Sequence, residues 1–207
     1  MKLRLTKHQN RLLLEFQKRA YSFDWDDNIL FMPTQIYLEK RVGESWIPIS
    51  VGTEEFREIR KFIGTDNSKG LPYRYQNNDI IKSFRDFRSY DSFLKDTKEA
   101  LKKKSFGPSF DKFIEALVYG SDFSIITARG NPPIAIKDAI KVILEDILSE
   151  DEKEKMMSNL HGVTLDEYLN LQDYYPVSSD SFMEEFGIES SSTDPEIAKT
   201  IALKSFV

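Results

Sequence analysis

Two short apolar segments, each followed at once by a polar loop, constrain the fold of this chain most strongly. The first, 20–23, ends at Asp24, and the second, 123–126, ends at Thr127. Short runs rich in aromatic and β-branched residues are typical of buried strands. The apolar spacing predicts a long amphipathic helix over 136–147. Strand, loop and helix therefore follow one another, which predicts an α/β fold built on a parallel sheet.

The rest of the chain predicts a hairpin and several helices. A hairpin is expected over 35–51, and Pro48 places its second arm at a sheet edge. Residues 64–80 are rich in turn residues and are expected to form a loop, and the charged run from residue 149 is expected to be a helix end and a solvated turn. Helices are also expected over 7–19, 53–63, 92–104, 110–117 and from Pro195, with a third strand over 174–179.

The composition excludes several classes of protein. The 207 residues include no cysteine, which rules out a disulfide framework, a thiolate nucleophile and a Cys-ligated metal. Lys and Arg number 29 against 34 Asp and Glu, a net charge of −5, which argues against broad binding of duplex nucleic acid. No stretch approaches the ~18 consecutive apolar residues of a membrane span, so a cytoplasmic location is expected.

The acids that follow the first predicted strand are the most specific chemical feature. Asp24 and Asp26 are two residues apart, so they share one face if the strand geometry persists. Two neighbouring carboxylates suit phosphoryl transfer, because one can attack phosphorus while the other protonates the leaving oxygen and later activates water. A Mg²⁺ ion held by both would offset their repulsion of the phosphate. The alternative is an acidic turn or a helix cap.

The first and second segments taken together resemble the motifs of a known protein family. Asp24-Trp25-Asp26 after a β-run, followed about a hundred residues later by a strand ending Ile126-Thr127-Ala128-Arg129-Gly130, resembles the first two motifs of the haloacid dehalogenase superfamily of phosphohydrolases. The resemblance implies a Rossmann-like parallel sheet with an inserted cap. The core would then comprise residues 1–31 and 119–207, and the cap, a hairpin plus helices, residues 32–118.

The resemblance also implies roles for single residues. Asp24 would be the nucleophile, Asp26 the general acid/base, and Thr127 a hydrogen-bond donor to the phosphoryl oxygen. Mg²⁺ would be bound by Asp24 and Asp26, the latter through its backbone carbonyl. The third motif is a lysine, for which Lys199 in the last predicted helix is the assigned candidate, with Lys204 as the other.

Four loop residues are assigned to substrate binding: Asn28, Thr127, Ala128 and Arg129. Asn28 stands in a position where the family usually has Thr or Val, and it offers either an amide contact or turn chemistry. Arg129 can clamp an anionic substrate, form a salt bridge to the cap, or take a helix-terminal role.

The fourth motif, an acidic group that completes the Mg²⁺ site, is not found before Val207, so a truncated or degenerate member with an incomplete metal site is expected. Asp180 is the substitute acid or else a helix cap. The sequence thus predicts a Mg²⁺-dependent phosphatase that acts through an aspartyl-phosphate on a phosphorylated small molecule or polymer end. The alternative is a non-catalytic protein that uses the same crevice to bind a partner.

Overall fold

A parallel three-stranded sheet forms the centre of the computed structural model, which describes residues 20–64, 72–188 and 194–206. Its strands lie in the order β1 (Ala20–Phe23), β5 (Asp122–Thr127) and β6 (Asp173–Pro176), and both neighbouring pairs are parallel. β5 is buried along nearly its whole length because it is the central strand and both faces are covered. The predicted α/β class with a parallel sheet is confirmed.

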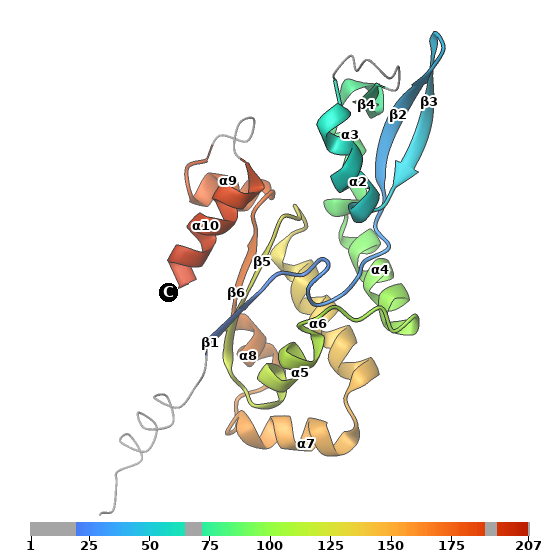
Figure 1. The fold of residues 1–207 in the computed structure, drawn as a ribbon. Helices are drawn as coiled ribbons and strands as arrows, with labels where there is room; N and C mark the ends of the chain where they lie inside the picture. The colour runs from blue at the N-terminus through green and yellow to red at the C-terminus, as the bar shows by residue number, and fades with distance from the viewer. Residues whose placement is uncertain (1–19, 65–71, 189–193, 207) are drawn as a thin grey trace, which may run out of the picture.

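Helices cover both faces of this sheet (Figure 1). Alternate residues of β5 point to opposite faces, so Phe123 and Ile125 join the main core cluster while Ile126 packs with residues of α9 and α10. The helices around the sheet are α4 (Tyr90–Lys102), α5 (Phe110–Val118), α6 (Pro133–Ile147), α7 (Glu150–Asn159), α8 (Leu165–Asn170), α9 (Asp180–Glu185) and α10 (Pro195–Phe206).

A separate antiparallel sheet lies between β1 and β5 in the sequence. Its strands are β2 (Ile36–Val42), β3 (Ser45–Val51) and β4 (Tyr73–Tyr75), in the order β3-β2-β4. The predicted hairpin is confirmed, and Pro48 lies on the edge strand β3. Figure 1 shows α2 and α3 on one side of this sheet. The short helical elements here are α2 (Thr53–Ile59), η1 (Arg60–Phe62), η2 (Gln76–Asn78), α3 (Ile80–Ser83) and η3 (Arg85–Phe87).

The two helices that close this stretch, α4 and α5, pack against the parallel sheet. Phe93 of α4 and Phe113 of α5 are fully buried in the same cluster as Phe23 and Ile136. Residues 90–118 therefore contribute to the main core, although the sequence places them in the predicted cap, residues 32–118. The boundary at residue 118 stays a prediction.

Two local predictions are wrong. Residues 64–80 contain β4, whose Arg74 pairs with Glu39 of β2, a contact between residues far apart in sequence that no local pattern indicates. The charged run from residue 149 forms the helix α7, whose start is fixed by a reciprocal capping box between Ser149 and Glu152. The helix predicted over 7–19 lies outside the described residues.

No helix among the described residues combines the length and the apolar character that crossing a bilayer requires.

Candidate functional site

The carboxyl ends of β1 and β5 bring the two predicted motifs together. Phe23 pairs with Ile125 in the parallel register, so Asp24 leaves β1 beside the end of β5, where Thr127 is the last residue. In open α/β sheets this edge is where ligands bind. The sequence predicted a parallel sheet with Asp24 and Thr127 at the ends of two of its strands, and the structure places them at the ends of adjacent parallel strands.

Lys199 of α10 contacts Asp24 directly. Its Nζ lies 2.7 Å from Asp24 Oδ2, while the backbone N–H of Trp25 donates to Asp24 Oδ1 at 2.8 Å. The two side chains are part-buried, with exposed fractions of 35% for Asp24 and 22% for Lys199. Glu196, one turn earlier on α10, lies 3.6 Å from the same ammonium group. A lysine and a carboxylate therefore meet at the sheet edge while both still reach solvent.

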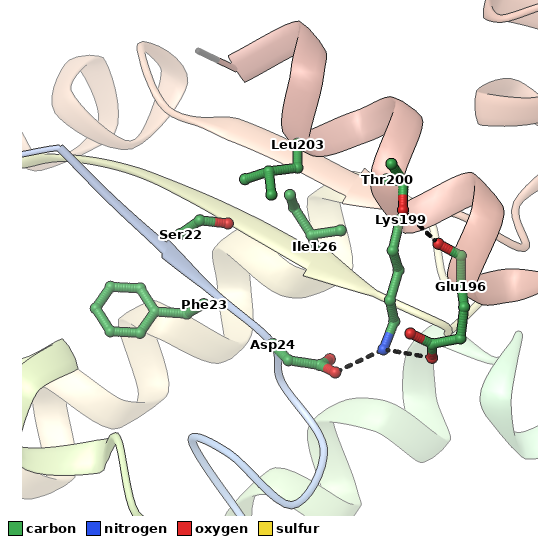
Figure 2. A pocket seen from close by; sticks show the side chains of 8 residues that line it. All are labelled: Ser22, Phe23, Asp24, Ile126, Glu196, Lys199, Thr200 and Leu203. Carbon is green, nitrogen blue, oxygen red and sulfur yellow. Dashed lines mark hydrogen bonds and ion pairs between the residues drawn. The ribbon is translucent and has the colours of Figure 1, made fainter.

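A pocket of about 230 Å³ opens beside this ion pair. Figure 2 shows its lining, in which Asp24 and Lys199 face each other across the gap between β1 and α10. Ile126 and Leu203 supply its apolar wall. The pocket has room for a small anionic group next to the ammonium group of Lys199.

Burial and the mutual attraction of Asp24 and Lys199 shift the pKa of each residue in opposite directions. Burial has the largest effect on Asp24 and raises its pKa. The hydrogen bond and charge of Lys199 lower this pKa, and the charge of Asp26 raises it. The net result is that the pKa of Asp24 lies above its ordinary value. Burial lowers the pKa of Lys199, but the hydrogen bond and charge of Asp24 outweigh it, so the net direction is upward. The ammonium form of Lys199 is thus favoured at neutral pH, where it can attract a phosphate.

Asp26 has a different partner. Its two oxygens accept from Arg129, Oδ2 from Nε at 2.8 Å and Oδ1 from Nη2 at 2.7 Å. Arg129 is fully buried and the Asp26 side chain is 17% exposed. The sequence left a substrate clamp, a salt bridge to the predicted cap and a helix-terminal role open for Arg129, and the structure shows a salt bridge to Asp26 of the first motif instead.

The other predicted binding residues lie in the two loops around these acids. Thr127 is fully buried, and its hydroxyl oxygen accepts from the N–H of Arg129 at 3.4 Å. Ala128 is exposed. The carbonyl of Asn28 accepts from the N–H of Ser109 at 2.9 Å, so its backbone takes part in the loop structure. The preceding Asp27 adopts the left-handed conformation, with φ of 59°, as turn chemistry predicts for an aspartate.

Asp180 is paired with Arg88. It occupies the first turn of α9, where Ser179 is the N-cap, and its carboxylate accepts from Nη2 of Arg88 at 2.6 Å. The same arginine donates through Nη1 to the carbonyl of Ser178 at 3.0 Å. Asp180 therefore ties α9 to the segment after η3.

The donors present fit a Mg²⁺ ion only in part. Asp24 could supply one carboxylate oxygen, the donor type that Mg²⁺ prefers. The carboxylate of Asp26 already accepts from Arg129 through both oxygens, and the resemblance assigns Mg²⁺ to the backbone carbonyl of Asp26 rather than to this carboxylate. Within residues 20–64, 72–188 and 194–206, no group of three or more His, Cys, Asp or Glu side chains is arranged to hold a metal. Binding of Mg²⁺ stays a prediction of the sequence.

Several residues that shape this site were not singled out by the sequence. Thr34 and Asp96 form a hydrogen-bonded chain to Arg129, while Phe87 and Phe93 lie over its guanidinium group. All four belong to the long stretch between the two motifs, and no spacing rule connects them with residue 129. Only the three-dimensional packing reveals them.

Comparisons of this chain with family models, with curated proteins and with solved structures give no match. The resemblance to the haloacid dehalogenase superfamily therefore rests on the two sequence motifs alone.

Proposed function

We propose that this protein is a phosphohydrolase of the haloacid dehalogenase type, with Asp24 as the nucleophile and Lys199 as the cation that neutralises the nucleophile and the phosphate. The parallel sheet would then be a Rossmann-like core, and the inserted segment that carries the antiparallel sheet of β2, β3 and β4 would be its cap. The observation that carries the proposal is the 2.7 Å contact between Lys199 Nζ and Asp24 Oδ2 at the carboxyl edge of that sheet.

The geometry supports a covalent route. Asp24 Oδ attacks phosphorus, the bond between phosphorus and the leaving oxygen breaks, and the leaving oxygen keeps the electron pair. Water then attacks the phosphorus of the aspartyl-phosphate, which releases inorganic phosphate and restores Asp24. The ammonium group of Lys199 offsets the charge that gathers on the phosphoryl oxygens. A bound Mg²⁺ would add Lewis-acid stabilisation of the same oxygens.

The pocket supports a phosphate ester or anhydride as substrate, from a small molecule or from the end of a polymer. Its polar groups gather around Lys199, and its volume of about 230 Å³ has room for a phosphoryl group. A cytoplasmic location is part of the proposal, and the absence of cysteine from the 207-residue sequence is compatible with a reducing compartment.

A second candidate function is phosphate or partner binding without turnover. It is favoured by one observation: Thr127 is fully buried and both oxygens of Asp26 accept from Arg129, so neither side chain stands free as a catalytic group would. In that case Lys199 and the pocket beside Asp24 would bind an anion, and no phosphoryl group would reach Asp24.

Trapping the covalent intermediate separates the two functions. The protein is incubated with acetyl phosphate or 4-nitrophenyl phosphate, with and without Mg²⁺, and then reduced with borohydride, which converts an aspartyl-phosphate to homoserine. Mass spectrometry is expected to find homoserine at position 24 in the wild type and none in Asp24→Asn. Saturable anion binding without modification of residue 24 would support the binding function and refute the phosphohydrolase.

A further inference from the structure

One stripe of α10 lines the pocket beside Asp24. Glu196, Lys199 and Leu203 are spaced i, i+3 and i+7 on that helix, so they lie on one face of it. At a rise of ~1.5 Å per residue, Glu196 and Leu203 are about 10 Å apart along the helix axis, with Lys199 between them. Figure 2 shows the acid at one end of this stripe and the leucine at the other. The pocket therefore changes from charged to apolar along its length.

Lys199 is the only cation among the pocket-lining residues that the structure describes. Its ammonium group contacts two carboxylates, Asp24 at 2.7 Å and Glu196 at 3.6 Å. The proposed function assigns the same ammonium group to the phosphoryl oxygens of the substrate. A second anionic group on a substrate would therefore find no further positive charge among these lining residues.

The apolar end of the pocket is a poor place for an anion. Ile126 is 6% exposed and Leu203 is 44% exposed, and together they form the wall there. The hydroxyl of Thr200 donates to the carbonyl of Glu196 at 2.9 Å, which leaves Ser22 as the lining side chain with a hydroxyl to offer. A carboxylate or phosphate at this end would exchange water for an apolar surface and a single hydroxyl group, which costs free energy.

The charged end of the pocket disfavours an anion for a different reason. The carboxylate of Glu196 lies beside Lys199, so an anion that extends past the ammonium group in this direction meets a like charge. The Glu196 side chain is 77% exposed, so water and salt weaken this repulsion. A screened repulsion between two charges near a protein surface is still large enough to change a rate several-fold.

We infer that the pocket selects phosphate monoesters and acyl phosphates whose organic part is uncharged, that Ile126 and Leu203 receive this part, and that Glu196 is a specificity-determining residue that repels anionic substrates. This inference rests on the proposed function and deepens it. It disfavours nucleoside polyphosphates, sugar bisphosphates and nucleic-acid ends, because each carries a further negative charge close to the phosphate that reacts.

The test compares 4-(carbamoylmethyl)phenyl phosphate with 4-(carboxymethyl)phenyl phosphate. The two compounds have the same size, and the methylene group keeps their leaving oxygens similar in basicity, so they differ mainly by one negative charge. For the wild type, kcat/KM is expected to be at least about fivefold higher for the amide, and this ratio is expected to shrink as ionic strength rises. Equal values of kcat/KM, or faster hydrolysis of the carboxylate, would overturn the inference.

Two variants locate the selection in the pocket. Glu196→Gln removes the charge and keeps the size of the side chain, and Leu203→Lys places a cation at the apolar end, so each is expected to lower the amide-to-carboxylate ratio. The control is Glu145→Gln on α6, an exposed acid outside the pocket lining, which is expected to keep the wild-type ratio. An unchanged ratio in a folded Glu196→Gln variant, or an equal change in Glu145→Gln, would refute the role of Glu196.

The ratio also separates selection from a general loss of activity, because both compounds are measured on the same protein. Circular dichroism checks that each variant is folded, and if Glu196→Gln is not, the wild type and Leu203→Lys decide.

The trapping experiment distinguishes failure of this inference from failure of the proposed function. Absence of homoserine at position 24 with 4-nitrophenyl phosphate and with both test compounds would refute the phosphohydrolase and this inference with it. Homoserine at position 24 together with equal kcat/KM for the two test compounds, or with no hydrolysis of the amide, would refute this inference alone.

Discussion

Lys199 and Asp24 are 175 residues apart in sequence, and a 2.7 Å contact joins them at the carboxyl edge of the parallel sheet. The lysine belongs to α10, of which Ala198 and Ala202 are buried against the sheet. The position of the ammonium group is therefore set by the packing of two alanines on its own helix. This pairing is the basis of the predictions on activity below.

The proposed role of Asp24 as the nucleophile is tested by Asp24→Asn. The amide keeps the size of the side chain and can still accept from the N–H of Trp25, but it cannot form an acyl phosphate. Phosphatase activity is expected to fall to the background of the assay while the circular dichroism spectrum is unchanged. Wild-type turnover by the variant would exclude the covalent mechanism.

The lysine is tested by Lys199→Met, with Lys204→Met on the same helix as its control. Loss of one group that stabilises charge in a transition state typically lowers kcat by about 10²- to 10³-fold, and this is expected for Lys199→Met. Lys204 is exposed, and its substitution is expected to leave the rate unchanged. Equal kinetics of the two variants, measured with 4-nitrophenyl phosphate, would remove Lys199 from the site.

Two acids on α4 are expected to change stability with pH in opposite directions. Burial raises the pKa of Asp96, partly offset by the hydroxyl of Thr34. The folded state then binds the proton more tightly than the unfolded state, so the stability contributed by this group is present below the ordinary aspartate pKa of 3.8 and is lost as pH rises through the folded value. Asp96→Asn, which keeps an acceptor for Thr34, should therefore be more stable than the wild type at neutral pH and equal to it in acid.

Glu99 provides the control of opposite sign. The hydrogen bond from Lys103 lowers the pKa of Glu99, so its contribution is present above the ordinary glutamate pKa of 4.5 and is lost as pH falls through the folded value. Glu99→Gln should thus be less stable than the wild type at neutral pH and equal to it in acid. Urea unfolding of the wild type and the two variants from acid to neutral pH measures both differences in stability. If both variants differ from the wild type in the same direction at neutral pH, the two opposite pKa shifts are contradicted.

A glycine in the turn before α5 supports the loop that follows Asp26. Gly107 donates to the carbonyl of Ile29 at 2.9 Å, and a Cβ atom at Gly107 would lie 2.3 Å from the carbonyl oxygen of Asn28. Gly107→Ala therefore forces two backbone segments apart and is expected to cost about 1–3 kcal/mol, as overpacking does.

The control for Gly107→Ala is Gly52→Ala, because no atom lies within 4 Å of a Cβ at Gly52. Gly52 is the N-cap of α2, and its substitution is expected to cost about 1 kcal/mol or less. Equal thermal unfolding midpoints for the two variants would show that the loop tolerates the added methyl group.

The sequence could predict those elements whose structure is determined by residues close together in the chain. The hairpin followed from alternation and from Gly43, which adopts a φ of 62° in its turn. β4 could not be predicted, because three residues show no periodicity and its pairing with β2 joins segments 35 residues apart, as the contact between Arg74 and Glu39 shows. The helix α7 was missed because only Met156 in it is buried.

In the candidate site, too, the features set by nearby residues could be predicted and those set by distant residues could not. Asp24 and Thr127 follow strands, so their meeting at one sheet edge is a consequence of parallel topology that the sequence already indicates. The sequence could not predict which charged side chains pair with each other. Nothing in the sequence tells whether Arg129 faces Asp26 or a substrate, because the orientation of its side chain is set by Phe87 and Phe93, which come from another part of the chain.

The distance in sequence between Asp24 and its lysine has a consequence during synthesis. A ribosome that adds ~5–20 residues per second needs roughly 10–35 s to pass from one to the other, given their separation of 175 residues. For that time the growing polypeptide carries the carboxylate without the cation that would draw a phosphate to it. The pair can form only after α10 has emerged and docked, so a nascent chain that lacks α10 is expected to leave cellular phosphate compounds untouched.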